Sequence, residues 1–528
     1  MPEAVDGASR AALVRQTLAA LGSALLARAT MPPFDLAPLA LVAWVPLLAL
    51  VGQVRLRALL AAATLQGITL NLAAHGWVMS GLEQAIDAPG WAAAGAWIAL
   101  AILQGLRTPL VFALVHLAVR HRCPLWLAFG ALQVLVEAVY PLLFPWTLAL
   151  QVHGVTAWLQ LAAVGGPALV SLWVGLANGL LAEAWRRRRR SGAAAAFAGA
   201  AALLLAGVTL FGQAAIARAE AREAEAPEAR LLVGHAVTAV DQRRPEPVPE
   251  LRRQTLSRLS DDPAVDLVIW PETVVGWPTP SLDIPKLARD YLLRDRALGT
   301  RAPVLRVPLL LGLVAEEDTG LYNSAALVRH PGVLLGRYDK RRLIPVGESD
   351  RLAPSLSGLG ELLPVATRFT SGSARDPISI GGHRLAVSIC YEDILPELIQ
   401  KSVLATDPEL LVNLTSDAWF RGTDAVDFHL ALSKLRAVEH AKYLVRSTRD
   451  GASAVIDSAG RVRARVDGAP SRAFHATVRW LPGFTPYAIH GSIWLLALLP
   501  LLGLTSLART GFISRAVRRV LRGVEADR

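Results

Sequence analysis

The chain has 528 residues, of which 53% are hydrophobic and only 18% are charged. A soluble domain usually carries about 25% charged residues, so a disordered chain and an ordinary cytosolic enzyme both fit this composition poorly. With only two cysteines, Cys123 and Cys390, the chain cannot be a disulfide-rich scaffold or hold a multi-cysteine metal site. The formal net charge of +11 would indicate nucleic-acid binding in a soluble protein. Whether it does so here depends on where the basic residues lie along the chain.

Long uncharged windows predict a membrane domain over residues 1–217. A helix needs about 20 largely apolar residues to cross the hydrocarbon core of a bilayer. We expect about seven transmembrane helices before residue 217 and a final one over residues 490–510. The windows before residue 217 are 12–30, 36–54, 58–82, 88–119, 124–142, 154–182 and 191–217.

Residues 220–485 have the composition of a globular domain, with frequent charges and punctuating Pro and Gly. The Ala/Glu-rich block 217–229 is interpreted as the connector into this domain. A basic tail, residues 511–528, follows the last apolar window.

The basic residues are distributed as the positive-inside rule requires of a membrane protein. Arginines occupy alternate loops, most densely at Arg186–Arg190, whereas the loop with Glu83 and Asp87 is acidic. With eight helices, every basic cluster lies on the cytoplasmic side. This pattern predicts that both termini are cytoplasmic and that the domain 220–485 lies outside the cytoplasm.

Within the domain 220–485, short β-rich runs alternate with amphipathic stretches, which predicts a layered α/β fold. Several runs end in polar residues. Glu272 ends DLVIWPE, Lys340 follows LVRHPGVLLGRYD, and Cys390 ends RLAVSIC. Asp417 and Trp419 follow the run ELLVNLTS.

Cys390 is a candidate nucleophile because its run is followed by an amphipathic segment, ILPELIQKSVL. A thiol attacks as the thiolate, and a helix N-terminus or a nearby cation lowers its pKa. Lys340 could supply the cation, and Glu272 could accept the thiol proton. The alternative is that Cys390 is a buried apolar filler, because free cysteine is among the most buried residue types.

The ordered motifs WPE, YDKRRLIPVGE, CYED and NLTSDAWF resemble those of the nitrilase superfamily of carbon–nitrogen hydrolases. This resemblance implies an αββα sandwich and a Glu–Lys–Cys triad. It assigns Glu272 as general base, Lys340 as the cation that stabilises the oxyanion, and Cys390 as nucleophile. Glu348 matches a second glutamate that supports the lysine and an incoming amine.

Further motifs extend the resemblance to nearly the whole chain. MPPFDLAPLALVAWVPLL (31–48) and FPWTLALQ (144–151) resemble the membrane half of the apolipoprotein N-acyltransferase family. By this resemblance Tyr391 and Glu392 are the residues that follow the nucleophile, and Trp419 lines the site. No metal or other cofactor is implied.

The resemblance also implies a reaction. A fatty acyl chain passes from a membrane phospholipid, through a thioester on the cysteine, to the α-amino group of the N-terminal diacylglyceryl-cysteine of an apolipoprotein. The protein is then expected in the bacterial inner membrane, with the catalytic domain on the periplasmic side and no nucleic-acid partner.

Two other functions stay open on the sequence, namely a membrane-tethered amidase or nitrilase acting on an extracytoplasmic amide and a non-enzymatic scaffold. The intact set of Glu272, Lys340, Glu348 and Cys390 favours an enzyme. Within the membrane domain, Arg107 is expected either to pair with Glu137 or to meet a phospholipid head group.

Overall fold

The computed structural model describes residues 2–86, 88–237, 248–292, 305–344, 348, 369–373, 377–468 and 470–509. The described chain divides into two compact units. The first contains the described residues up to Gly76, then Ala94–Gln213 and the residues from Ser492 on. The second contains Trp77–Ala93 and Ala214–Gly491. Asp87 and the basic tail 511–528 lie outside the described residues.

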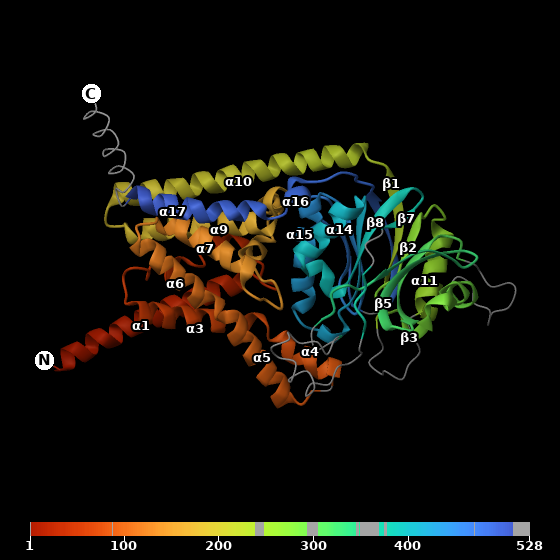
Figure 1. Ribbon diagram of the computed structural model, residues 1–528, viewed down its shortest axis with the longest axis horizontal. Helices are drawn as coiled ribbons and strands as arrows, with labels where there is room; N and C mark the ends of the chain where they lie inside the picture. Colours follow the sequence, from red (N-terminus) through yellow and green to blue (C-terminus); the bar gives the residue numbers. More distant parts are fainter. Residues whose placement is uncertain are drawn as a thin grey trace, which may run out of the picture. The chain divides into compact units, whose positions relative to one another are not determined.

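The first unit is helical (Figure 1). Among the described residues, four helical stretches are long and apolar enough to cross a membrane, namely Leu56–Ala74, Gly90–Arg120, Ala162–Arg186 and Ser191–Glu225. The helices that lie wholly or partly in this unit are α1 (Pro2–Ala29), η1 (Ala37–Leu41), α2 (Val45–Leu48), α3 (Leu56–Ala74), α5 (Gly90–Gly105), α6 (Arg107–Arg120), α7 (Leu125–Val139), η2 (Leu148–Val152), α8 (Thr156–Leu159), α9 (Ala162–Arg186), α10 (Ser191–Glu225), η9 (Ile493–Ala497) and α17 (Leu498–Arg509).

Several apolar windows, among them 36–54, 58–82 and 154–182, do not fold as the single long helices that we expected. The window 36–54 contains only the short helices η1 and α2, and each has a proline in its first turn, Pro38 or Pro46. Proline lacks the N–H of a helix interior and starts helices better than it continues them. The window 58–82 is broken at Gly76, after which α4 (Trp77–Ile86) belongs to the second unit.

Arg107 and Glu137 do not form the ion pair that we considered. Nη1 of Arg107, at the start of α6, donates to the carbonyl oxygen of Trp146 at 2.8 Å. Oε1 of Glu137 instead accepts from Nε2 of Gln133 at 2.9 Å and from the backbone N–H of Leu148 at 3.0 Å. Both charged side chains therefore satisfy part of their hydrogen-bonding capacity within the helical unit.

The connector expected at 217–229 is largely helical, because α10 continues to Glu225 before β1 begins at Glu228. Alanine, glutamate and arginine are strong helix formers, so the sequence AREAEA extends the helix. The end of α10 belongs to the second unit, where Tyr443 donates from its hydroxyl to Oε2 of Glu223 at 2.9 Å.

The second unit contains two β-sheets. In the first sheet the strand order is β13-β1-β2-β4-β5-β6, with β3 beside β4. In the second it is β12-β11-β10-β9-β8-β7. The strands are β1 (Glu228–His235), β2 (Leu267–Ile269), β3 (Val275–Pro280), β4 (Leu309–Glu317), β5 (Gly320–Arg329), β6 (Val333–Asp339), β7 (Ile378–Ile380), β8 (His383–Ile389), β9 (Leu410–Ser416), β10 (Leu444–Arg449), β11 (Ser453–Ile456), β12 (Val462–Val466) and β13 (Arg472–Arg479).

An apolar core joins the two sheets and includes Leu231, Leu310, Leu385 and Val412, all nearly or fully buried. The helices α11 (Val248–Asp261) and α12 (Ile284–Leu287) share a separate core with the outer face of the first sheet. The outer face of the second sheet is covered by α14 (Pro396–Thr406), α15 (Ala425–His440) and α16 (Pro486–His490) (Figure 1). These layers confirm the expected αββα sandwich.

The parallel strands of this sandwich place the predicted site. In the first sheet β1 and β2 are parallel, and β2 and β4 are parallel. In the second sheet β8, β9 and β10 are parallel. Functional side chains in α/β proteins gather beyond the carboxyl ends of such strands. Glu272 follows β2, Cys390 follows β8, and Asp417 follows β9.

Candidate active site

Lys340 lies between two glutamates in the interior of the second unit. Its Nζ is 2.8 Å from the Glu348 carboxylate and 3.4 Å from Oε1 of Glu272. All three side chains are buried, with Lys340 only 1% exposed. A lysine can be buried as an ammonium only when it is paired and hydrogen-bonded. The structure thus brings together three of the residues that the sequence singled out.

Asn323 on β5 completes this cluster. Its Nδ2 donates to Oε1 of Glu272 at 2.7 Å and to Oε1 of Glu348 at 3.0 Å. The Glu348 carboxylate also accepts from the backbone N–H of Ile344 at 3.0 Å. Two carboxylates are therefore held on one ammonium and one amide, which fixes the directions of all four side chains.

Burial and charge set the protonation of this cluster. Burial alone would lower the pKa of Lys340, but the carboxylates of Glu348 and Glu272 outweigh it and raise that pKa well above its usual value. The pKa of Glu272 is raised, chiefly by burial and despite the opposing effect of Lys340, with Glu348 adding to the increase. Lys340 therefore stays cationic, whereas Glu272 holds a proton more readily than an exposed carboxylate.

Cys390 occupies a strained turn at the end of β8, as the first residue of η7 (Cys390–Ile394). Its φ of +50° lies in the left-handed region, which costs a residue with a Cβ about 1–2 kcal/mol. Nδ2 of Asn413, on β9, donates to the Cys390 carbonyl oxygen at 3.3 Å and to Oγ of Ser388 at 3.1 Å. Such strain, kept in place by surrounding hydrogen bonds, is typical of functional turns.

The direction of the Cys390 pKa shift differs from our expectation. Burial raises that pKa well above its usual value, and Glu272, Glu348 and Asp417 add to the effect, which Lys340 only partly opposes. The expected helix N-terminus does not follow the cysteine directly, because α14 begins only at Pro396. The thiol is therefore protonated at neutral pH, and a base must remove its proton during the reaction.

Glu392 joins the cysteine turn to the lysine turn. One carboxylate oxygen accepts from the backbone N–H of Ile389 at 2.9 Å and from the Tyr338 hydroxyl at 2.8 Å. The other accepts from the backbone N–H groups of Arg341 and Arg342 at 2.7 and 3.1 Å. The Glu392 carboxylate thus accepts four hydrogen bonds. These bonds hold the backbone before Cys390 and the backbone after Lys340 in fixed positions.

Tyr391 and Trp419 are only partly buried. Tyr391 packs against the core between the sheets. Trp419 belongs to η8 (Ala418–Phe420), whose Phe420 meets Trp77 of α4 edge-on, with ring centroids 5.0 Å apart. Whether these two side chains line the substrate site stays a prediction from the sequence.

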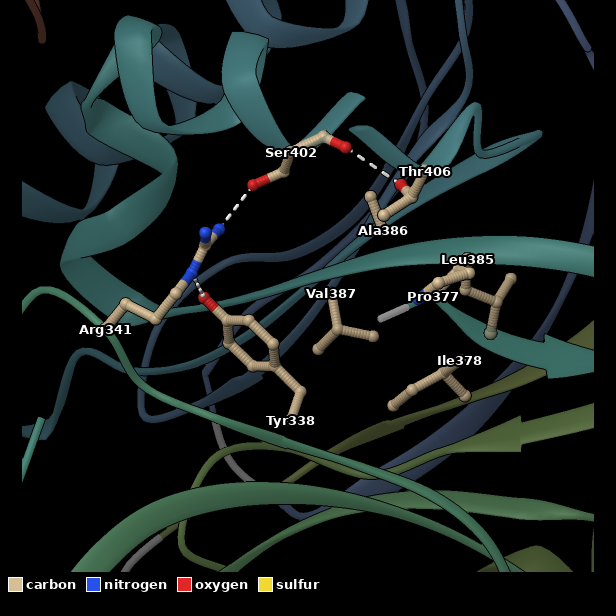
Figure 2. A pocket seen from close by; sticks show the side chains of 9 residues that line it. All are labelled: Tyr338, Arg341, Pro377, Ile378, Leu385, Ala386, Val387, Ser402 and Thr406. Atoms are coloured by element: carbon tan, nitrogen blue, oxygen red, sulfur yellow. Dashed lines mark hydrogen bonds between the residues drawn. The ribbon is translucent and has the colours of Figure 1, made fainter. Parts of the chain in front are cut away.

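A separate pocket lies beside β7 and β8 (Figure 2). Tyr338 and Arg341 form one side, where Nε of Arg341 donates to the Tyr338 hydroxyl at 3.2 Å. The other lining residues are Pro377, Ile378, Leu385, Ala386, Val387, Ser402 and Thr406. None of Glu272, Lys340 and Cys390 lines this pocket, so it is not the candidate active site.

The sequence did not reveal four polar partners of the site, namely Asn323 and Asn413, described above, and His429 and Arg446, which both contact Asp393 in the turn after Cys390. Two of them interrupt apolar β-runs, Asn323 in LYNSAALV and Asn413 in LLVNLTS. A polar side chain inside a buried strand needs a partner, which is the signal that could have found both. Among the described residues, no group of three or more His, Cys, Asp and Glu side chains could hold a metal ion.

Comparison with known proteins identifies relatives of both parts of the chain. The family model described as "Carbon-nitrogen hydrolase" matches residues 232–471, and that described as "Apolipoprotein N-acyltransferase N-terminal domain" matches residues 23–180. An apolipoprotein N-acyltransferase from Geobacter metallireducens is 27% identical over 91% of this chain and 92% of its own length. The chain belongs to the apolipoprotein N-acyltransferase family.

Other relatives match over shorter regions. An apolipoprotein N-acyltransferase from Nitrosomonas europaea is 32% identical over 42% of this chain, and the match spans about half of that relative, 45% of its length. A solved structure, a carbon–nitrogen hydrolase from Helicobacter pylori, is similar over 48% of this chain and 90% of its own, with 15% identity and a TM-score of 0.34.

Proposed function

We propose that this protein transfers a fatty acyl chain from a membrane phospholipid to the α-amino group of the N-terminal diacylglyceryl-cysteine of an apolipoprotein. The observation that carries the proposal is the buried cluster of Glu272, Lys340 and Glu348, which acts electrostatically on the Cys390 thiol. The same chain carries apolar helices of membrane-spanning length, as an enzyme with two lipid substrates requires.

In the first half-reaction Sγ of Cys390 attacks the ester carbonyl carbon of the phospholipid. Glu272 takes the thiol proton as the C–S bond forms, because the raised thiol pKa leaves little free thiolate. Lys340 faces the negative charge that develops on the carbonyl oxygen, a type of interaction worth about 3–4 kcal/mol per donor. The C–O bond then breaks, and Glu272 returns the proton to the departing lysophospholipid.

In the second half-reaction the lipoprotein amine attacks the thioester carbon. Glu272 now accepts a proton from the amine, and the C–S bond breaks to release the Cys390 thiolate, which takes that proton back. Glu348 keeps Lys340 charged and aligned through the 2.8 Å contact between them. The products are the N-acylated lipoprotein and the free enzyme, ready for another phospholipid.

The proposed side of the membrane follows from the basic loops. Arg186–Arg190 are expected in the cytoplasm, and the catalytic unit on the periplasmic side of the bacterial inner membrane. Both substrates carry their reacting groups at the membrane surface, so a catalytic domain that is anchored by helices on both of its ends suits the reaction.

The intact mass of the purified protein tests the nucleophile. After incubation with phospholipid, the wild-type chain should gain one acyl chain that hydroxylamine removes, because thioesters are cleaved readily by that amine. Cys390→Ala should gain none, and Cys123→Ala, the matched control at the other cysteine, should be acylated like the wild type. Acylated Cys390→Ala protein would contradict the assignment.

The acceptor is tested separately. Acylated enzyme should lose its chain to a diacylglyceryl-cysteine peptide with a free N-terminus, with formation of an amide, and should not lose it to an N-acetylated peptide. Rapid loss of the chain to water in the absence of peptide would favour a hydrolase, the alternative that the cysteine chemistry leaves open.

A further inference from the structure

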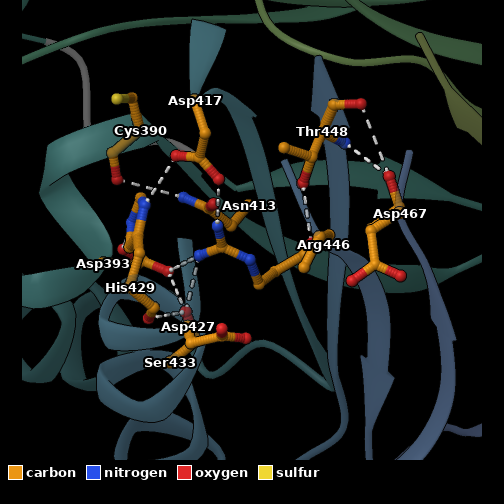
Figure 3. Close-up of polar contacts among 12 residues, drawn as sticks. Cys390, Asp393, Asn413, Asp417, Asp427, His429, Ser433, Arg446, Thr448 and Asp467 are labelled. Carbon is orange, nitrogen blue, oxygen red and sulfur yellow. Dashed lines mark hydrogen bonds and ion pairs between the residues drawn. The ribbon is translucent and has the colours of Figure 1, made fainter. Parts of the chain in front are cut away.

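His429, on α15, contacts two buried carboxylates at once (Figure 3). Its Nε2 is 2.7 Å from Oδ1 of Asp393, three residues after the candidate nucleophile. Its Nδ1 is 3.0 Å from Oδ1 of Asp417, which follows β9 and precedes Trp419. One ring therefore connects the turn that carries Cys390 to the turn after the neighbouring strand.

Both ring nitrogens must donate, because ionised carboxylates can only accept. Arg446 on β10 contacts both carboxylates, since its guanidinium donates to Asp393 at 2.9 Å and lies 3.4 Å from Asp417. Against burial, the charges of His429 and Arg446 lower the pKa of Asp393. Oγ of Ser433 also donates to Asp393, at 2.6 Å. An imidazole that donates from both nitrogens is an imidazolium, so His429 carries a positive charge.

The charges of this network balance. Asp393 and Asp417 contribute two negative charges, and His429 and Arg446 two positive charges. Asp393, Asp417 and Arg446 are at most 1% exposed, and the His429 side chain is 13% exposed. A buried network with one unpaired charge is strongly destabilised, whereas a balanced and hydrogen-bonded one is tolerated.

The network acts on the nucleophile in two ways. Asp393 lies in the same 3₁₀ turn as Cys390, so its position helps to set that of the thiol. Asp417 is one of the carboxylates whose charge opposes formation of the Cys390 thiolate. A cation placed on Asp417 reduces that opposition.

We propose that His429 is a positioning residue, which as an imidazolium ties the Cys390 turn to the Asp417 turn and balances the two carboxylates beside the nucleophile. The charged groups that face its ring are Asp393 from η7, Asp417 from the turn after β9, and Arg446 from β10. Because of the two aspartates, and against burial and Arg446, the pKa of His429 rises to about 9, which agrees with a charged ring at neutral pH.

The inference deepens the proposed function and rests on Cys390 as its nucleophile, but its test needs no lipid. Iodoacetamide alkylates a thiolate, so the rate of Cys390 alkylation against pH, measured in the Cys123→Ala background, reports the thiol directly. The result for His429 is therefore independent of whether the protein transfers acyl chains.

Charge balance predicts opposite effects for the two neutral variants. His429→Gln leaves the two aspartates with a single cation, Arg446, so the alkylation profile should move to higher pH by about one unit, roughly a tenfold slower rate at neutral pH. Asp417→Asn removes the opposing charge, so its profile should move to lower pH. The double variant His429→Gln/Asp417→Asn restores the balance, and its profile should return toward that of the wild type.

His383→Gln is the matched control. Nδ1 of His383 also lies 2.7 Å from a carboxylate oxygen, that of Glu409, but the pair is near the start of β8 and partly exposed. Its alkylation profile should equal the wild-type profile. The inference is overturned if His429→Gln leaves the profile unchanged, or if the double variant is as slow as His429→Gln. Should the single variant not fold, the double variant decides, because a folded and reactive double variant supports charge balance and an unfolded one contradicts it.

Discussion

At the scale of single residues, the candidate site contains buried charges, each of which would be strongly destabilising without its partners. Lys340 is charged in the interior because Glu272 and Glu348 hold it there, and Asn323 is the neutral donor that lets two carboxylates share one ammonium. Glu348 pairs with Lys340 and accepts from Asn323 and the backbone of Ile344, so it belongs to the lysine cluster.

The raised pKa of Cys390 also has a chemical consequence at this scale. In the proposed mechanism, proton transfer to Glu272 accompanies attack on the ester, because burial raises the pKa of the thiol and keeps it protonated. A resting enzyme without a standing thiolate is less open to oxidation, because susceptibility to oxidation follows thiolate character and exposure.

The charged state of His429 predicts a pH dependence of stability. A raised folded-state pKa stabilises the protein at pH values below the unfolded pKa of 6.5, and this contribution is lost as the pH rises through about 9. The full contribution amounts to about 3 kcal/mol at 1.36 kcal/mol per pKa unit. The difference in free energy of unfolding between wild type and His429→Gln should therefore shrink from pH 6.5 to pH 9. Denaturant unfolding of both proteins in detergent measures it, and a constant difference would show that the ring is neutral when folded.

At the scale of secondary-structure elements, close strand packing fixes the position of Glu272. Gly312 on β4 faces the segment after β2, and its N–H donates to the carbonyl oxygen of Pro271 at 3.1 Å. A Cβ at position 312 would lie 2.5 Å from Cα of Glu272 and 2.5 Å from the backbone nitrogen of Thr273. Both contacts are with backbone atoms, so no side-chain rotation can relieve them.

Gly312→Ala should therefore damage the site by displacing Glu272. Overpacking typically costs about 1–3 kcal/mol of stability, and a shift of about 1 Å in a catalytic group can slow a reaction roughly 100-fold. Formation of the Cys390 thioester should fall far more than the yield of folded protein. Gly276→Ala is the control on the neighbouring strand β3, because a Cβ there meets only the carbonyl oxygen of Thr273 at 3.8 Å. Equal activity of the two variants would contradict the role given to Gly312.

At the scale of the whole molecule, the chain combines a helical unit with a catalytic sandwich. Trp77–Ala93 is drawn from the apolar N-terminal half of the sequence and yet groups with the sandwich, where Trp77 packs on Phe420. The DAWF turn therefore has a hydrophobic partner that is distant in sequence, which couples its position to a segment of the N-terminal half.

The proposed orientation predicts where reporters will be active. A reporter enzyme that works only in the periplasm should be active when inserted after Gly382, in the exposed turn between β7 and β8. The same reporter inserted after Arg188 should be inactive, because basic loops are retained in the cytoplasm. A thiol-accessibility assay on intact cells provides an independent measurement, and activity at Arg188 alone would reverse the orientation.

The sequence by itself determined the layered α/β class and the candidate nucleophile, because both depend on local patterns, whereas the αββα arrangement was expected from the family resemblance. Alternating β-runs and amphipathic segments specify α/β layers, and the motifs around Glu272, Lys340, Glu348 and Cys390 are contiguous. The number of continuous apolar helices could not be predicted reliably from hydropathy. The window 36–54 has the hydropathy of one span, but Pro38 and Pro46 divide it into two short helices.

Only the tertiary structure decided which polar residues support the nucleophile and what state it is in. Asn323 and His429 lie far from Cys390 in sequence, and only the pairing of strands and the packing of α15 bring them to the site. The direction of the Cys390 pKa shift also could not be obtained from sequence. It is the balance of burial and several carboxylates against one lysine, and both burial and distance are properties of the folded chain.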